Sequence, residues 1–113
     1  MNVTIRDEGG VHVVTLSGDL DANTSPVAQQ QILPLATEGS RILLDMTGVS
    51  FMSSAGLRLL LSTYRQVAVQ KGTVALAGLS EDLKDTMSMT GFLSFFTIHD
   101  TTESGLQAMQ SQG

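Results

Sequence analysis

The sequence predicts a single α/β domain in which a mixed sheet of about five strands is flanked by four helices. Its 113 residues suffice for one hydrophobic core but not for two. Hydrophobic residues make up 42% of the chain and charged residues 15%, as in globular proteins. After two opening strands, apolar runs of strand length alternate with segments of helical period. The domain is expected to span 1–113, with a structured core over about 2–110.

The first two strands are predicted to form a hairpin. Residues 2–6 alternate between apolar and polar side chains, and residues 11–16 form a second run of strand type. The glycine pair at 9–10 permits a tight turn between them.

A polar loop leads from this hairpin into the first helix. Asn23, Thr24 and Ser25 are candidate N-caps, and Pro26 suits the first helical turn. Pro34 removes a backbone donor, so we expect the helix to kink or to end early there.

The middle of the chain predicts a buried strand followed by a long helix. The run 41–46 is suited to a central strand covered on both faces, and the helix extends from about 55 to 70. Lys71-Gly72 is expected to form its C-cap. The apolar stripe of the helix contains Leu57, Leu60, Leu61, Tyr64, Val67 and Ala68.

The last third of the chain continues the alternation. The expected elements are a strand over 73–77, a helix capped by Ser80 and reaching Met89, a strand over 95–99 and a terminal helix to about Met109. Asp100 and Glu103 have capping-box spacing for the last helix. The tail 110–113 is expected to fray.

The charge pattern argues against direct nucleic-acid binding. Eleven acidic residues against six basic ones give a formal charge of −5, and the basic residues are scattered rather than gathered in a stripe. The chain has no cysteine, its first residues lack the pattern of a signal peptide, and no apolar stretch approaches the roughly 20 residues that span a bilayer. These features predict a soluble cytoplasmic protein with no membrane partner.

No enzyme signature is present. His12 and His99 have no motif partner, and neither a Gly-x-Ser-x-Gly pattern nor a Walker phosphate loop occurs. The acidic pairs at 7–8 and 81–82 are interpreted as solvated caps. We therefore predict no catalytic residue, no metal site and no cofactor.

The segment 51–58 (FMSSAGLR) is the most informative stretch. It places Ser53 and Ser54 where a loop becomes a helix, and there unpaired backbone N–H groups and partial positive charge favour an added phosphoryl group. Such a group would add about −1.5 to −2 charges to a surface that a partner must cover. The alternative is that one serine is simply an N-cap worth about 1 kcal/mol, and the two serines alone favour this simpler interpretation.

The whole chain resembles a STAS domain of the anti-sigma-factor antagonist group. The matching stretches are 18–24 (GDLDANT), 41–61 (RILLDMTGVSFMSSAGLRLLL) and 74–91 (VALAGLSEDLKDTMSMTG). The resemblance implies a partner-switching role for a protein that is not an enzyme. The bare protein would capture a GHKL-type serine kinase that doubles as an anti-sigma factor. The kinase would then phosphorylate a serine at the helix start and dissociate, and a PP2C-type phosphatase would reset the switch.

This chain departs from the family pattern at the phosphorylated position. The family form reads Asp-Ser-Ser-Gly, whereas this chain has Ser53, Ser54, Ala55 and Gly56, so Ala55 stands where the family has the acceptor serine. Either Ser54 accepts the phosphate, with Ser53 as second choice, or the protein is a constitutive binder. A Ser-Ser-Ala-Gly-Leu-Arg variant also occurs in similar proteins, and we favour Ser54.

The loop 19–24 resembles the family segment that flanks the switch serine, although turn chemistry and helix capping by Thr24 explain the same residues. Leu59 is assigned to the polar side of its helix and is expected to be an exposed contact residue. Met87, Met89 and Phe92 are expected to serve packing. The predicted partner-binding residues are Asp21, Asn23, Thr24, Ser53, Ser54, Ala55, Gly56, Leu57, Arg58 and Leu59.

Ala55 also motivates an alternative function. A non-phosphorylated STAS subunit can serve as a structural adaptor, for example in a lipid-transport ABC assembly. For either role, the resemblance implies a monomer.

Overall fold

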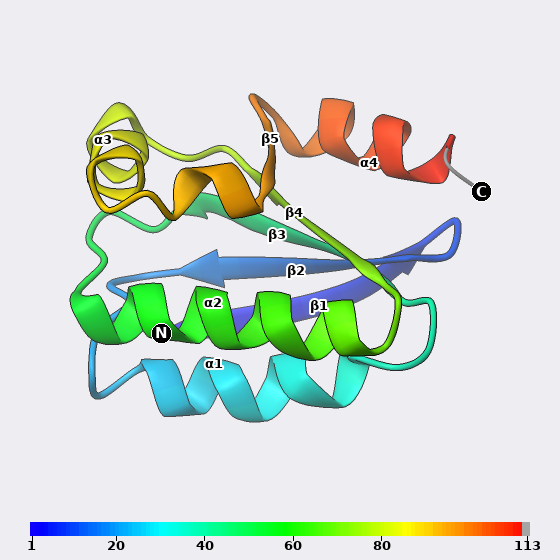
Figure 1. Cartoon of the computed structure of the whole chain (residues 1–113), viewed down its shortest axis with the longest axis horizontal. Helices are drawn as coiled ribbons and strands as arrows, with labels where there is room; N and C mark the ends of the chain where they lie inside the picture. Colours follow the sequence, from blue (N-terminus) through cyan, green and yellow to red (C-terminus); the bar gives the residue numbers. More distant parts are fainter. Residues whose placement is uncertain (112–113) are drawn as a thin grey trace.

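The computed structural model of the protein describes residues 1–111 (Figure 1). Its strands are β1 (Asn2–Glu8), β2 (Val11–Ser17), β3 (Arg41–Gly48), β4 (Thr73–Ala77) and β5 (Thr97–His99). Its helices are α1 (Ser25–Ile32), α2 (Ser54–Val69), α3 (Glu81–Met89) and α4 (Thr102–Gln110), with short 3-10 turns at Leu33–Leu35 and Leu93–Phe95. Residues 112 and 113 of the tail, for which we expect fraying, lie outside the described residues.

The predicted mixed sheet is confirmed. Its five strands lie in the order β1-β2-β3-β4-β5. β1 and β2 are antiparallel, and the expected turn at Gly9 and Gly10 joins them with positive φ angles of 58° and 87°. The remaining neighbours are parallel, so each connection between them needs a crossover, which the helices supply.

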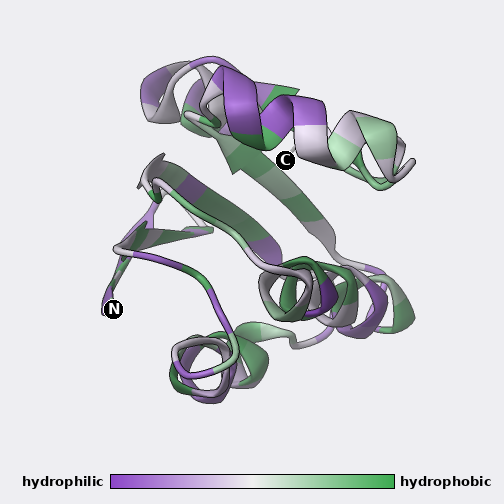
Figure 2. Cartoon of the chain, turned by 90° about the vertical axis from the view of Figure 1, so that its left-hand side faces the viewer, coloured by the Kyte–Doolittle hydropathy of each residue, from purple (hydrophilic) through white to green (hydrophobic). Residues whose placement is uncertain are grey.

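The sheet is covered on both faces, as the apolar run of the central strand predicts. Figure 2 shows α1 and α2 on one side of the sheet and α4 on the other. Ile42, Leu44 and Met46 of β3 face the larger hydrophobic cluster, which also receives side chains from α1, α2 and α3. Leu43 points to the opposite face and packs in a smaller cluster with Met109 of α4. Because successive side chains of a strand point to opposite faces, the side chains of β3 contribute to both hydrophobic clusters.

The ends of α1 and α2 follow from individual residues. The early end expected at Pro34 is confirmed, because α1 ends at Ile32 and a 3-10 turn takes over. At the end of α2, Lys71 adopts the left-handed conformation (φ 60°), and the N–H of Gly72 donates to the carbonyl of Val67 at 2.8 Å. A glycine is required at position 72 because the chain packs closely there: a Cβ would lie 2.4 Å from the Ser40 carbonyl oxygen.

Two expectations about the later helices need correction. The capping box of α4 is formed by Thr101 and Ser104, one residue beyond the predicted pair Asp100 and Glu103. A threonine hydroxyl in this position accepts from the N3 backbone N–H while the Ser104 side chain accepts from the N-cap N–H. Met89 is 88% exposed rather than packed, because α3 turns only Leu83 and Met87 into the core.

The apolar stripe of α2 is also displaced from the predicted one. Ala68, assigned to the stripe, is exposed, whereas Thr63 is fully buried. The Thr63 hydroxyl donates to the Leu59 carbonyl at 2.9 Å, which satisfies its polar group within the helix. The buried arc of α2 is wide because both the sheet and α1 cover this helix.

We predict that Leu44→Ala lowers the free energy of unfolding by about 2–5 kcal/mol, because a fully buried side chain would leave a cavity between the sheet and the helices. Val69→Ala, at a side chain that is 76% exposed, should change it by no more than about 0.5 kcal/mol. Urea denaturation followed by circular dichroism measures both. A cost below about 1 kcal/mol for Leu44→Ala would contradict the packing described.

Candidate functional site

The loop before α1 and the start of α2 are joined by backbone hydrogen bonds. The Leu20 N–H donates to the Phe51 carbonyl and the Ser53 N–H donates to the Leu20 carbonyl, each at 2.9 Å. Leu20 and Met52 thereby form a short parallel bridge beyond the regular sheet. The pairing places the loop 19–24 beside the first turn of α2, at the left-hand edge of Figure 1. The predicted site residues from two distant stretches therefore lie together.

Gly56 permits this close approach. A Cβ at this position would lie 2.7 Å from the Leu20 carbonyl oxygen and 2.7 Å from Cγ of Met52. The clash with the oxygen involves backbone, which cannot rotate away as a side chain can. Gly56 and its neighbour Leu57, both predicted to bind the partner, are buried, so they position the surface rather than offer side chains to it.

The loop itself is ordered by Asp21 and Thr24. Oδ1 of Asp21 accepts the backbone N–H groups of Asn23 at 2.9 Å and Thr24 at 3.1 Å. These N–H groups, with that of Thr24 foremost, hold the pKa of the Asp21 carboxyl below its ordinary value of 3.8. The Thr24 hydroxyl donates to the Asp19 carbonyl at 2.7 Å and accepts the Asp21 N–H at 2.9 Å. Thr24 thus stands at the N-cap position of α1, but its side chain does not cap the helix as predicted.

The two serines at the start of α2 have different surroundings. Ser53 occupies the N-cap position with extended backbone (ψ 178°), yet its side chain accepts no N–H group of the first turn. Its Oγ is buried and has no hydrogen-bond partner among the described residues. Ser54 is the first helical residue, and its side chain is exposed. The simple capping interpretation is therefore not realised, and only Ser54 presents its side chain to solvent.

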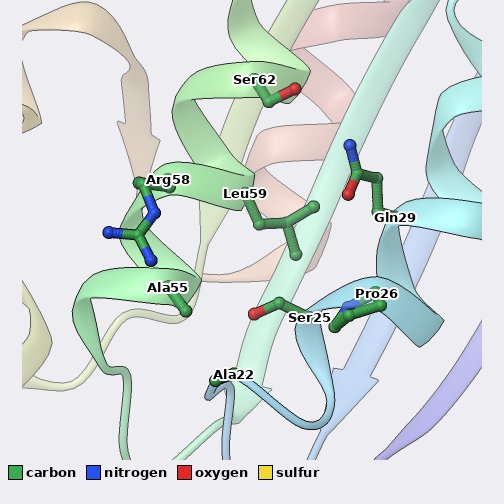
Figure 3. Close-up of a pocket in the computed structure, with 8 residues that line it drawn as sticks. All are labelled: Ala22, Ser25, Pro26, Gln29, Ala55, Arg58, Leu59 and Ser62. Atoms are coloured by element: carbon green, nitrogen blue, oxygen red, sulfur yellow. The ribbon is translucent and has the colours of Figure 1, made fainter.

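A groove of about 330 Å³ runs between α1 and α2 beside these serines (Figure 3). We call it the α1–α2 groove, and its lining residues are Ala22, Ser25, Pro26, Gln29, Ala55, Arg58, Leu59 and Ser62. Figure 3 shows the Ser25 hydroxyl turned toward α2 and the Arg58 guanidinium turned toward Ala55. Ser25 is 7% exposed, and its Oγ has no hydrogen-bond partner among the described residues.

The prediction that Leu59 is exposed is wrong. The residue is only 4% exposed and belongs to the larger hydrophobic cluster. Its side of α2 is covered because α1 packs along that helix beside the sheet. Leu59 instead forms an apolar part of the α1–α2 groove.

The groove contains residues that the sequence analysis missed. Ser62 lies one helical turn beyond Arg58, so helical spacing could have identified it. Ser25 and Gln29 belong to α1, and their position against α2 depends on how the two helices pack. The sequence carries no local signal for that packing.

Metal-binding and membrane-spanning features are not observed in the part of the chain that the structure describes. Within residues 1–111 no three or more His, Asp or Glu side chains gather in a way that could hold a metal ion. None of the helices described there is long and apolar enough to cross a bilayer.

The fold and this arrangement define a STAS domain. The STAS domain family model matches residues 2–105, and the chain belongs to that family. The anti-sigma-B factor antagonist of Bacillus subtilis (strain 168) is 30% identical over 107 residues, which cover 95% of this chain and 98% of that protein.

Solved structures agree with this assignment at the level of the fold. The anti-sigma factor antagonist SpoIIAA in its unphosphorylated form superimposes with a TM-score of 0.81 at 19% identity, covering 97% of each chain. The Bacillus cell fate determinant SpoIIAA in the phosphorylated form gives a TM-score of 0.74 at 20% identity, covering 96% of this chain and 99% of that one.

We predict that Gly56→Ala destabilises the domain by about 1–3 kcal/mol, because the added methyl overpacks against the Leu20 carbonyl. This cost exceeds the gain of up to about 1 kcal/mol that alanine brings to a helix. Ser54→Ala, two residues earlier in the same turn and exposed, should stay within about 0.5 kcal/mol of the wild type. Urea denaturation compares the two variants, and a stabilised Gly56→Ala would contradict the close approach.

The lowered pKa of Asp21 predicts an acid-sensitive loop. The ionised carboxylate is the form that the Asn23 and Thr24 N–H groups bind, so its contribution to stability is present above pH 3.8 and is lost as the pH falls through the lower folded pKa. Carbon-detected NMR titration of the Asp21 carboxyl should give a pKa below 3.8, and Asp21→Asn should destabilise the protein at pH 7. An unshifted or raised pKa would contradict the hydrogen bonding described.

Proposed function

We propose that this protein is an anti-sigma-factor antagonist that works as a phosphorylation-controlled partner switch and catalyses no reaction itself. Its bare form binds a GHKL-type serine kinase that is also the anti-sigma factor, through the loop 19–24 and the first turn of α2. Phosphorylation of Ser54 releases the kinase, and a PP2C-type phosphatase removes the phosphate. The observation that carries this proposal is the exposed Ser54 at the start of α2, directly beside the loop that Leu20 holds in place.

Burial favours Ser54 over Ser53 as the acceptor. A kinase must reach the hydroxyl oxygen, and the Oγ of Ser53 is buried while the Ser54 side chain is exposed. The first turn of α2 has no side-chain cap, so its N–H groups and partial positive charge are available to a phosphate on the same turn. SpoIIAA, which shares this fold, has been solved in phosphorylated and unphosphorylated forms.

The proposed switch needs only a modest energy. A hundredfold release of a partner corresponds to about 2.7 kcal/mol of differential binding. A phosphate adds about −1.5 to −2 charges to a chain whose formal charge is already −5, and it displaces any partner group that contacts the bare hydroxyl. Loss of one buried hydrogen bond together with like-charge repulsion accounts for an energy of this size.

Ala55 supports a second candidate function. This residue stands where the family has its acceptor serine, and its half-buried methyl group lines the α1–α2 groove. A protein that is never phosphorylated would act as a STAS adaptor subunit, for example in a lipid-transport ABC assembly. Co-purification with an ABC ATPase rather than with a GHKL kinase would favour this adaptor role.

We predict that incubation with ATP-Mg²⁺ and the GHKL kinase encoded nearest to this protein adds one phosphate, which intact-mass spectrometry detects. Ser54→Ala should abolish the addition while leaving kinase binding intact, and Ser53→Ala should still be phosphorylated, because the Ser53 hydroxyl is buried. Ser54→Asp should weaken binding, though less than a real phosphate because its charge is smaller.

Three results would overturn parts of this proposal. Kinase binding without phosphorylation would make the protein a constitutive antagonist, and the absence of both would favour the adaptor role. Tight, kinase-insensitive binding by Ser54→Asp would exclude charge as the cause of release.

A further inference from the structure

Arg58 is a basic residue of the candidate site that has no acidic partner. It is the only basic residue in the two stretches that form the site, 19–24 and 51–58. It is exposed, and it takes part in no ion pair with any residue in the range 1–111. Because α2 carries no acidic residue, no carboxylate on the same helix competes for the guanidinium.

The spacing of Ser54 and Arg58 suits a contact on the surface of α2. Residues four apart are neighbours on a helix, with Cβ atoms roughly 5–6 Å from each other. Helical side chains lean toward the N-terminus of the helix, so the later residue reaches back over the earlier one. Figure 3 shows this for Arg58, whose guanidinium turns toward Ala55 in the first turn. An acidic group at position 54 would precede the arginine, which is the more favourable order for such a pair.

A phosphate on Ser54 would need a positive neighbour, because the loop beside it is acidic. Asp19 and Asp21 belong to this loop, which backbone hydrogen bonds hold next to the first turn of α2. Their carboxylates repel a dianion, whereas the N–H groups of the uncapped first turn attract it. Arg58 is the only basic residue on α2 within about one helical turn of position 54, since Arg65 lies roughly 16 Å farther along the helix axis.

We propose that Arg58 is a positioning residue for the phosphorylated state, in which its guanidinium donates to the phosphate oxygens on Ser54 and holds the phosphate along the surface of α2. A planar guanidinium donates two parallel N–H bonds to one phosphate, which a lysine cannot do. This assignment rests on the proposed function in that Ser54 is the acceptor. Phosphorylation then changes two groups of the predicted partner-binding surface, because it adds a charge at Ser54 and engages an arginine that is free in the bare form.

The pair can be tested on protein that carries the phosphate without the action of a kinase. Phosphoserine is incorporated at position 54 of the full-length chain during synthesis, and ³¹P NMR follows the second ionisation of the phosphate, whose ordinary pKa is about 6. Because Arg58 favours the dianion, we expect this pKa to be about 0.5 pH units lower in the wild type than in Arg58→Gln. Arg58→Lys should recover part of the difference, and high salt should reduce it.

A matched variant separates this pair from the other charges of the site. Arg65→Gln removes one positive charge from the same exposed helix surface, and its phosphate should titrate within about 0.1 pH units of the wild type. The helix N-terminus, Asp19 and Asp21 are present in every variant, so the difference between the variants reports the arginine alone. Phosphorylation should also slow solvent exchange of the Arg58 Nε–H at least about threefold. Equal phosphate pKa values in the wild type and Arg58→Gln, or an equal effect of Arg65→Gln, would overturn the proposal.

The kinase distinguishes this pair from the proposed function. A kinase that phosphorylates Ser54, together with equal phosphate pKa values in the wild type and Arg58→Gln, would leave the proposed function standing and overturn the pair. A kinase that leaves Ser54 unmodified would remove the proposed function. In that case a phosphate pKa lowered by Arg58 in the protein made with phosphoserine would still support the pair.

Discussion

Leu20 and Met52 extend the pairing of β2 with β3 past the end of the regular sheet, and the backbone bonds of this bridge connect the two stretches that form the site. Without them, the loop 19–24 and the first turn of α2 would be separate surface features about thirty residues apart in the sequence. Gly56 makes this bridge possible, because a residue without a side chain lets the helix start close to the Leu20 carbonyl. The arrangement of the candidate site thus depends on backbone geometry.

The start of α2 lacks a side-chain cap, as does the start of α1, whereas the starts of α3 and α4 are both capped. Ser80 caps α3 and Thr101 caps α4 through side-chain hydrogen bonds, whereas Ser53 at α2 makes none. Two further hydroxyls, those of Ser25 and Ser40, are also buried without partners, but only Ser25 faces the α1–α2 groove. Buried donors without partners cost stability in the isolated domain.

The sequence predicted the α/β architecture because its apolar periods are strong and its turn residues are well placed. The end of α1 at Ile32, two residues before Pro34, and the hairpin at Gly9 and Gly10 follow from local chemistry alone. Leu59 was misassigned and Ser25 was missed as a groove residue because their burial depends on α1 packing against α2, which is a tertiary contact. The family pattern marks the candidate site at the start of α2, whereas the lining of the α1–α2 groove depends on helix packing.

The position of the proposed acceptor, Ser54, decides how a phosphate would act on the neighbouring groove. Successive helical residues are rotated by roughly 100°, so Ser54 does not face the way that Ala55 does, into the groove. Ser54 and Arg58 are four residues apart and therefore adjacent on the helix surface. A phosphate on Ser54 would therefore lie beside the Arg58 guanidinium. Moving the acceptor by one residue, from the position of Ala55 to that of Ser54, would then place the phosphate next to this arginine rather than at the wall of the groove.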